Sequence, residues 1–492
     1  MSLFRRKSID HLLKEAGESD KGLKRSLTAP SLVALGIGAI IGAGLFVRTA
    51  AAAGEHAGNA VVMSFIIAAV GCAFAGLCYA EFASMIPIAG SAYTYAYTTM
   101  GELLAWIIGW ALILEYALGA ATVSIAWSEY LNNLLGGAIP YSLCHSPFEI
   151  SSAGEHGLIN LPALFILLFL SLILIRGTQE SAMVNAVIVF VKVAIVLLFI
   201  GIGWKYLNPA NHTPFLIPDN APPVDLGNGK TYDYSPAFNH GWLGVLRGAA
   251  IVFFAFIGFD AVSTAAQEAK NPKRDMPIGI LGSLVICTIL YVLFSWVLTG
   301  VAPYTDFVKA GKEASVVYAI QHYMAGYGWL GTLVTVAILA GFSSVILVML
   351  LGQSRVFYSM SKDGLLPKTF SDIHPKFRTP WKSNLILFAF VGIFGGFIPG
   401  SVAGDLTSIG TLFAFVLVCI AVWIMRRKSP ELHRPFRTPL VPVVAILGVL
   451  VCGAMIISLD KVTQLSALGW MLVGLCIYFG YSRTRSKLHP LK

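Results

Sequence analysis

Twelve apolar stretches limit what this chain of 492 residues can fold into. An α-helix needs about 20 predominantly apolar residues to cross a lipid bilayer. Only 12% of the residues are charged, whereas a soluble protein carries about 25%, so most of the surface is expected to face lipid. The sequence therefore predicts an all-α polytopic membrane protein with about twelve transmembrane helices. The expected spans are residues 30–53, 59–85, 101–130, 158–176, 181–204, 241–266, 276–302, 328–361, 384–399, 402–426, 438–458 and 464–482.

The positive charges predict how these spans are oriented. With the N-terminus inside the cell, 26 of the 34 Lys and Arg residues fall in cytoplasmic segments, and positive residues concentrate on that side of a membrane. Both termini are therefore expected in the cytoplasm, in a protein of the cell membrane with an even number of spans. The net charge of +9 lies in the short loops and does not indicate a nucleic-acid-binding surface.

Glycines interrupt the first expected span, and a second interruption is expected in the sixth. The first span contains Gly36, Gly38, Gly42 and Gly44, and each glycine inside a helix costs about 1 kcal/mol relative to alanine. The sixth contains Gly258, followed closely by a charged residue. Interrupted helices at corresponding positions of two halves indicate a transporter binding site. The alternative, glycines that only allow close helix packing, is weaker for the pair of spans than for the first span alone.

An unwound pair of helices has the chemistry to bind a small zwitterion. Freed N–H groups at the start of one half-helix attract an anion, and the helix dipole adds to this attraction. Freed carbonyl groups at the end of the other half-helix can accept hydrogen bonds from an ammonium group. Such backbone is tolerated at membrane depth only where it lines a protein cavity.

Lys192 lies in the middle of the fifth expected span. A charged residue inside the membrane is costly and marks function by default. The favoured interpretation is that Lys192 exchanges a proton during a transport cycle. The alternative is a structural lysine that bonds to the freed backbone carbonyls.

Other polar residues within spans leave more than one interpretation open. Glu115 either contacts the substrate side chain, balances a buried cation, or is a hydrogen-bonded packing group. Asp260 is expected to cap the second half of span six. Ser343 and Ser344 either bond to carbonyls of their own helix or face the break in span one and meet the ammonium of Lys192.

No enzyme signature accompanies these features. The histidines show no metal-ligand spacing, and the sequence has no nucleotide-binding loop and no nucleophile elbow. Neither enzymatic activity, a metal nor a cofactor is expected.

Six longer strings carry a resemblance to a known family. They are GAIIGAGLF at 38–46, YAEFASMIPIAGSAY at 79–93, GWALILEY at 109–116, FIGFDAVST at 256–264, KNPKRDMP at 270–277 and GQSRVFYSMSKDGLLP at 352–367. The first three resemble the amino acid–polyamine–organocation superfamily, and the last three narrow the resemblance to its bacterial cationic amino acid transporter branch. The resemblance extends from about residue 25 to the C-terminal spans.

The resemblance implies a leucine-transporter-like fold that works by alternating access, with five-plus-five inverted repeats and two C-terminal helices. The implied organisation is a cytoplasmic tail at 1–27, a transport core at 28–427 with repeats at about 28–205 and 240–427, two additional helices at 428–482 and a cytoplasmic tail at 483–492.

The resemblance also implies uptake of an L-amino acid together with protons rather than sodium. The backbone around Ala43 and Gly44 would bind the carboxylate, and Lys192 would take the place of a sodium ion. The carbonyls of Ile40, Phe254, Ala255 and Ile257 would accept the ammonium. The full set of implied substrate-binding residues is Ile40, Ile41, Gly42, Ala43, Gly44, Glu115, Phe254, Ala255, Phe256, Ile257 and Phe342, and the proton-coupling set is Lys192, Ser343 and Ser344.

Two departures leave the substrate open. Many relatives have threonine where this chain has Ala43, and many bacterial relatives have aspartate where it has Ala111. Small neutral amino acids are therefore as compatible with the sequence as arginine or lysine. The alternatives to symport are an exchanger without net proton flow and a sensor that binds without carrying. The expected partners are protons and the lipid bilayer, and a small membrane subunit or an oligomer stays open.

Overall fold

The computed structural model describes residue 7 and residues 27–86, 91–151, 154–177, 182–227, 230–309 and 315–487. Within this part of the chain the architecture is almost entirely helical. The two strands, β1 (Val224–Gly227) and β2 (Lys230–Tyr232), form one small antiparallel hairpin.

The helices follow the expected spans in order. Nine described helical segments are long and apolar enough to cross a membrane, and three shorter apolar helices accompany them, which confirms the all-α polytopic class. The helices are α2 (Ala29–Ile40), α3 (Thr49–Ala52), α4 (Val61–Met85), α5 (Ser91–Thr99), α6 (Glu102–Leu134), α7 (Tyr141–Cys144), α8 (Leu161–Arg176), α9 (Ala182–Gly203), α10 (Gly241–Val252), α11 (Pro272–Val301), α12 (Tyr304–Lys309), α13 (Ser315–Tyr323), α14 (Gly328–Lys362), α15 (Trp381–Phe397), α16 (Gly400–Lys428), α17 (Val441–Ser458), α18 (Lys461–Ile477) and α19 (Arg483–Arg485).

Local signals in the sequence explain where several of these helices begin and end. The side chain of Asn160 accepts a hydrogen bond from the N–H of Ala163 at the start of α8, and Asp460 does the same for Thr463 in α18. Helix α8 ends at Arg176 and is followed by Gly177, whose left-handed backbone (φ 76°) is a common helix stop.

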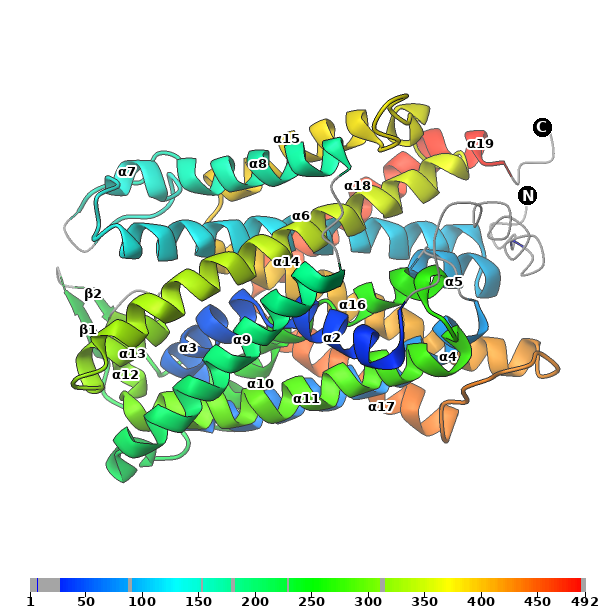
Figure 1. The fold of residues 1–492 in the computed structure, drawn as a ribbon. Coiled ribbons are helices and arrows are strands. Elements are labelled where there is room, and N and C mark those ends of the chain that lie inside the picture. The colour runs from blue at the N-terminus through cyan, green and yellow to red at the C-terminus, as the bar shows by residue number, and fades with distance from the viewer. Residues whose placement is uncertain are drawn as a thin grey trace.

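The long helices run side by side between two ends of the molecule (Figure 1). We call the end with β1, β2 and α7 the hairpin end, and the end with α5 and α19 the terminal end. Lys7 forms an ion pair with Asp363 at 2.9 Å, and the N–H of Lys487 donates to the carbonyl of Asp363 at 3.1 Å. Both described chain limits therefore lie at the terminal end, as an even number of spans requires.

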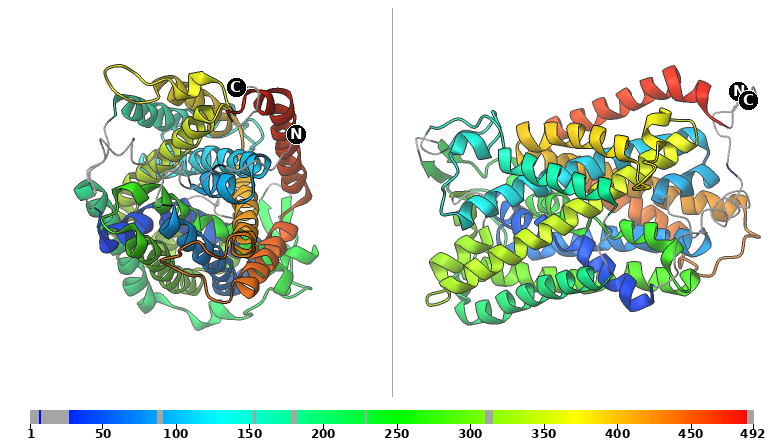
Figure 2. Two further views of the ribbon diagram at one scale, coloured as in Figure 1. Left: turned by 90° about the vertical axis from the view of Figure 1, so that its right-hand side faces the viewer. Right: turned by 45° about the horizontal axis from the view of Figure 1, so that its top comes forward.

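The centre of the bundle is formed by the helices that carry the candidate site. Helices α6 and α10 are mostly buried inside the protein, whereas α18 is mostly exposed. Figure 2 shows α18 at the periphery of the bundle in both views. Its apolar exposed face fits contact with lipid.

Candidate functional site

The first span is interrupted directly after α2. Helix α2 ends at Ile40, and Ile41 has extended backbone angles (φ −72°, ψ 106°). Helical structure resumes as η1 (Gly44–Arg48), a short π-helix, and continues through α3 into η2 (Ala53–Ala57). The interruption expected from the glycines is present, and it leaves the last carbonyls of α2 without helical partners.

The sixth span is interrupted in the same way. Helix α10 continues into the 3₁₀-helix η7 (Phe253–Phe256), and a second 3₁₀-helix, η8, begins at Asp260. Gly258 between them has φ 118°, a backbone conformation that costs glycine least. A Cβ atom there would lie 2.8 Å from the carbonyl oxygen of Ala39. The second break therefore rests against the end of α2.

The two interruptions touch each other through bare backbone. A Cβ atom on Gly44 would lie 2.1 Å from the Cα atom of Ala255, closer than any side chain permits. This contact brings the residues predicted to bind a carboxylate next to those predicted to bind an ammonium. The alternative interpretation of the glycines, close packing, therefore also holds at Gly44.

Tyr291 of α11 joins the two breaks, and the sequence analysis missed it. Its hydroxyl lies 3.1 Å from the carbonyl oxygen of Ile40 and 2.8 Å from that of Ala255. Its ring packs at 5.2 Å from the ring of Phe256. These two carbonyls belong to the set predicted to accept a substrate ammonium. A tyrosine inside an apolar helix carries no local signal of this position.

Lys192 of α9 lies against the end of α2. Its Nζ donates to the carbonyl oxygen of Gly38 at 2.8 Å, and its side chain is almost fully buried. A Cβ atom on Gly341 would lie 2.7 Å from Cε of Lys192, so the lysine is enclosed between α2 and α14. The charged residue expected in the fifth span is thus in contact with the first break.

Ser343 and Ser344 of α14 differ in their surroundings. The hydroxyl of Ser343 donates to the carbonyl of Leu339 at 2.9 Å, which is the own-helix alternative. Ser344 is buried one position further along α14.

Apolar side chains surround the two breaks. Ile41, Phe256 and Phe342 are all buried. The ring of Phe342 packs against Phe46 at 6.4 Å and against Tyr130 at 5.7 Å. Phe254 contributes its carbonyl, which accepts from the N–H of Ile257 at 3.3 Å. A ligand held here would therefore have its side chain in an apolar environment.

Glu115 belongs to a polar group beside the second break rather than to the contact between the breaks. It is fully buried in α6 and interacts electrostatically with Asp260. Asp260 accepts a hydrogen bond from the Tyr116 hydroxyl at 2.8 Å. The expectation that Asp260 caps the second half of span six is wrong in detail, because Phe259 occupies the cap position and Asp260 is the first residue of η8.

A small cavity of about 20 Å³ extends from the first break toward the hairpin end. Its lining includes Ala43 at the break and Arg48, Thr122 and Ser401 further along. A space of this size holds about one water molecule. Among the described residues, no group of three or more His, Cys, Asp or Glu side chains is placed to hold a metal ion.

Comparisons with known proteins identify permeases and transporters as similar to this chain. The amino acid permease family model matches residues 27–480. A branched-chain amino acid permease of Bacillus subtilis is 44% identical over 99% of both chains. A methylthioribose transporter of the same organism is 41% identical, again over 99% of both chains. A vacuolar cationic amino acid transporter of Arabidopsis thaliana is 34% identical over 87% of this chain and 68% of its own length.

Proposed function

Because the chain belongs to the amino acid permease family, we propose that it is a secondary active transporter that carries an L-amino acid across the cell membrane together with protons. The membership confirms the resemblance of the sequence motifs, and the relatives are permeases and transporters, not enzymes. The observation that carries the proposal is the contact between two broken helices, one of which is bonded to a buried lysine.

The substrate backbone binds between the two breaks in this proposal. The N–H groups of Gly42, Ala43 and Gly44 precede a helical run, where first-turn donors are unpaired and the dipole favours an anion, so they hold the carboxylate. The carbonyls of Ile40, Phe254, Ala255 and Ile257 hold the ammonium. Because Gly44 and Ala255 now touch, the two segments separate when the substrate enters, as alternating access requires.

The proposed substrate class is neutral and aliphatic. Ile41, Phe256 and Phe342 are apolar and buried, and burying a methylene group against such residues stabilises a complex by about 0.8 kcal/mol. Glu115 is not in this apolar group, because it lies beside Asp260. The B. subtilis permease at 44% identity, named for branched-chain amino acids, supports the same class.

Proton coupling is assigned to Lys192. A charged lysine donates to the carbonyl of Gly38 and secures the end of α2. Loss of its proton weakens this hydrogen bond, since bonds from charged donors are about twice as strong as neutral ones. The position of α2 then depends on protonation. Ser343 and Ser344 lie on α14, the other helix against Lys192, and shape its surroundings.

In this proposal the orientation rests on the charge distribution, and the organisation rests on the resemblance of the sequence motifs. The terminal end is cytoplasmic and the hairpin end is outside, with inverted repeats at about 28–205 and 240–427. Residues 428–482 add the last two helices, and the tails are 1–27 and 483–492.

The decisive experiment measures leucine uptake into proteoliposomes with and without an inward proton gradient. The gradient is expected to raise the initial rate several-fold in the parent protein and to have no effect in Lys192→Met. Lys382→Met is the matched control, because Lys382 is an exposed lysine, and it should behave like the parent. Uptake that ignores the gradient in the parent protein would show an exchanger instead of a symporter.

A second candidate substrate is favoured by one observation. The 41% identical relative is a methylthioribose transporter, and a thiosugar has neither a carboxylate nor an ammonium. A thermal-shift screen of the twenty amino acids and methylthioribose separates the two, because a ligand that binds only the folded protein raises the melting temperature. Binding without flux would instead indicate a sensor.

A further inference from the structure

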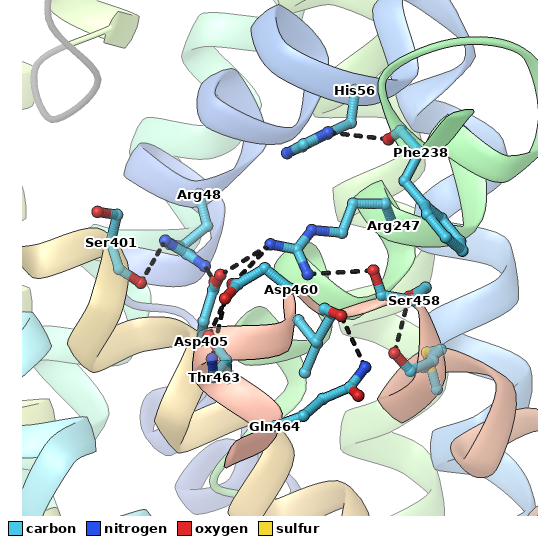
Figure 3. A network of polar contacts seen from close by, with 12 residues as sticks. Arg48, His56, Phe238, Arg247, Ser401, Asp405, Ser458, Asp460, Thr463 and Gln464 are labelled. Carbon is cyan, nitrogen blue, oxygen red and sulfur yellow. Dashed lines mark hydrogen bonds and ion pairs between the residues drawn. The ribbon is translucent and has the colours of Figure 1, made fainter. Parts of the chain in front are cut away.

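The charges at the two ends of the peripheral helix α18 differ in whether the protein pairs them. At the hairpin end, Asp460 caps α18 and forms an ion pair with Arg247 of α10 at 3.1 Å (Figure 3). At the terminal end, α18 continues through η10 (Tyr478–Ser482), a short π-helix, into α19, which contains Arg483 and Arg485. Within the described part of the chain, neither of these two arginines forms an ion pair. Their charges are therefore available to a partner outside the protein.

Tryptophans hold one face of α18 against α6. Trp470 of α18 and Trp110 of α6 each donate an indole N–H to the carbonyl of the other residue, at 3.1 Å and 2.8 Å. Trp106 donates to the carbonyl of Gly474 at 2.9 Å, and a side chain at Gly474 would overlap the ring of Trp110. These contacts fix the rotation of α18 about its own axis. They also determine which of its side chains point away from the bundle.

The outward face of α18 carries an apolar stripe that ends in an arginine. Leu468, Leu472, Cys476, Phe479 and Arg483 follow one another at intervals of three or four residues, which places them along one side of a helix. The first four are exposed, and the exposed fractions of the two leucines are 56% and 54%. The guanidinium of Arg483 lies over the ring of Phe479, 6.0 Å from its centre. The stripe therefore leads from hydrocarbon side chains directly to a positive charge.

The backbone that carries the arginines is held by the end of α14. The hydroxyl of Ser482 donates to the carbonyl of Leu365 at 2.6 Å. Gly364 has φ 82°, and a side chain there would overlap the carbonyl of Arg485. The guanidinium of Arg485 is stacked over the ring of Tyr481, 4.6 Å from its centre. Because this segment is already ordered, a ligand that binds the arginines loses little affinity to the ordering of flexible groups.

An acidic phospholipid matches this surface in both of its parts. Its acyl chains are hydrocarbon, like the aliphatic side chains of the stripe, and its phosphate lies at the level of the headgroups, where the stripe ends. Arginine binds phosphate through parallel N–H donors, and basic residues near a membrane surface attract acidic lipids. A zwitterionic phospholipid is bound less well, because its own ammonium group already neutralises the phosphate.

We propose that the exposed stripe of α18, together with Arg483 and Arg485, is a binding site for an acidic phospholipid in the leaflet at the terminal end. The acyl chains lie along Leu468 and Leu472, and the two arginines bind the headgroup. Because the arginines stand on a segment bonded to the end of α14, the lipid reinforces the junction between α18 and α14. The assignment of this leaflet to the cytoplasmic side rests on the proposed function, whereas the site itself does not.

A dye on the native Cys476 tests the site without relying on transport. Cys476 is exposed and the other six cysteines are buried, so monobromobimane labels this position, and Cys476→Ser provides the blank. The labelled protein is placed in nanodiscs of phosphatidylcholine that contain increasing fractions of dibrominated phosphatidylglycerol or dibrominated phosphatidylcholine. Bromine quenches the dye only at short range, so quenching reports which lipid lies against α18. Half-maximal quenching should need about a tenfold smaller fraction of phosphatidylglycerol, the scale of one or two basic residues near an acidic lipid.

Three variants test which charges recognise the lipid. Arg483→Gln and Arg485→Gln should each raise the fraction of phosphatidylglycerol needed for half-maximal quenching about fivefold. Lys382→Gln is the matched control, because Lys382 lies at the same end of the molecule and already pairs with Asp372 at 2.8 Å. It should leave that fraction unchanged. Melting temperatures equal to that of the parent protein establish that the variants are folded.

Three outcomes would refute the lipid site. Equal quenching of the parent protein by the two brominated lipids would show that α18 does not select a headgroup. A shift by Lys382→Gln as large as that by Arg483→Gln would show a diffuse attraction to the whole positive face. Absence of quenching by either lipid would show that a second copy of the chain covers this face. A failure of the proposed function would appear separately, as absent leucine uptake with the lipid preference intact.

Discussion

The two helix breaks touch each other, but a lysine lies at the first and an aspartate at the second. The first break ends a half-helix, and Lys192 donates to one of its last carbonyls. The second break starts a half-helix, and Asp260 is its first residue. A positive group favours the C-terminal end of a helix and a carboxylate favours the N-terminal end. Lys192 and Asp260 thus each lie at the helix end whose partial charge is opposite to that of their ionised form.

The difference between the breaks lies in where each charge is attached. Asp260 belongs to the segment that it stabilises, so it moves with that segment. Lys192 belongs to α9, and its bond to Gly38 joins two separate helices. The bond of Lys192 to Gly38 changes when α9 and α2 shift relative to each other, whereas the attraction between Asp260 and the start of its own helix does not. Asp260 is joined to α6 separately, through Tyr116. We therefore expect the charge at the first break to couple protons to motion, and the charge at the second break to stabilise.

The largest expected effect comes from separating the breaks. Gly44→Ala places a methyl group against the Ala255 backbone, whereas Gly42→Ala meets only the side chain of Val345 at 3.1 Å. Leucine uptake should fall about 100-fold in Gly44→Ala, the cost of displacing a site by about 1 Å, and much less in Gly42→Ala. Equal uptake by the two variants, both monodisperse after purification, would show that the breaks do not form the site.

The second test compares the two charges directly. Lys192→Met should abolish the response of uptake to a proton gradient. Asp260→Asn should keep that response and instead lower the free energy of unfolding by about 1–3 kcal/mol, because its bond with Tyr116 changes. The melting temperature and the ratio of uptake with and without a gradient provide both readouts. The comparison breaks down if Asp260→Asn also loses the gradient response.

The third test removes the group that both breaks share. Tyr291→Phe deletes the hydroxyl that reaches Ile40 and Ala255, and should cost about 1–3 kcal/mol of stability because buried carbonyls lose a partner. Tyr130→Phe is the matched control, since its hydroxyl donates to the carbonyl of Phe46 in η1, at 3.3 Å. Thermal unfolding should show a larger loss for Tyr291→Phe, and an equal loss would argue against a shared role.

The smallest effect is expected from an ionisable group outside both breaks. Burial lowers the pKa of His145 near α7, but hydrogen bonds with Cys144 and Glu129 outweigh it and raise the pKa to about 11. A raised pKa gives stability that is complete below the ordinary value of 6.5 and lost as the pH rises toward 11. His145→Gln should therefore lower the melting temperature more at pH 6 than at pH 9.

His145→Gln also serves as a control for the comparison of the two breaks, because transport should not depend on the pair of His145 and Glu129. Leucine uptake by His145→Gln is expected to keep its response to a proton gradient. A lost response would mean that charges far from the breaks also couple protons to motion.

The sequence was sufficient for features that stand out locally. Glycines inside the first span and a lysine inside an apolar run are anomalies that can be seen without the fold. Together with Gly258 in the sixth span they predicted both breaks, and the contact of Lys192 with freed carbonyls was one of the two interpretations left open for it. The positions of the spans along the chain could likewise be predicted, from apolar stretches long enough to cross a membrane.

Other features depend on residues that only the fold brings together. Tyr291 and Ile40 are 251 positions apart, and a tyrosine in an apolar helix is ordinary by itself. Arg48 carries no local signal of its ion pair, because its partner Asp405 lies 357 positions away. Glu115 left three interpretations open, and its neighbour Asp260 could not be identified from spacing along different helices.

The hydroxyl of Tyr291 has one hydrogen and faces two acceptors. At any moment it can donate to the carbonyl of Ile40 or to that of Ala255, and the other oxygen goes without it. An ammonium group has three hydrogens and can satisfy both oxygens at once. Between the two breaks, Tyr291 therefore offers one hydrogen where an ammonium group would offer three.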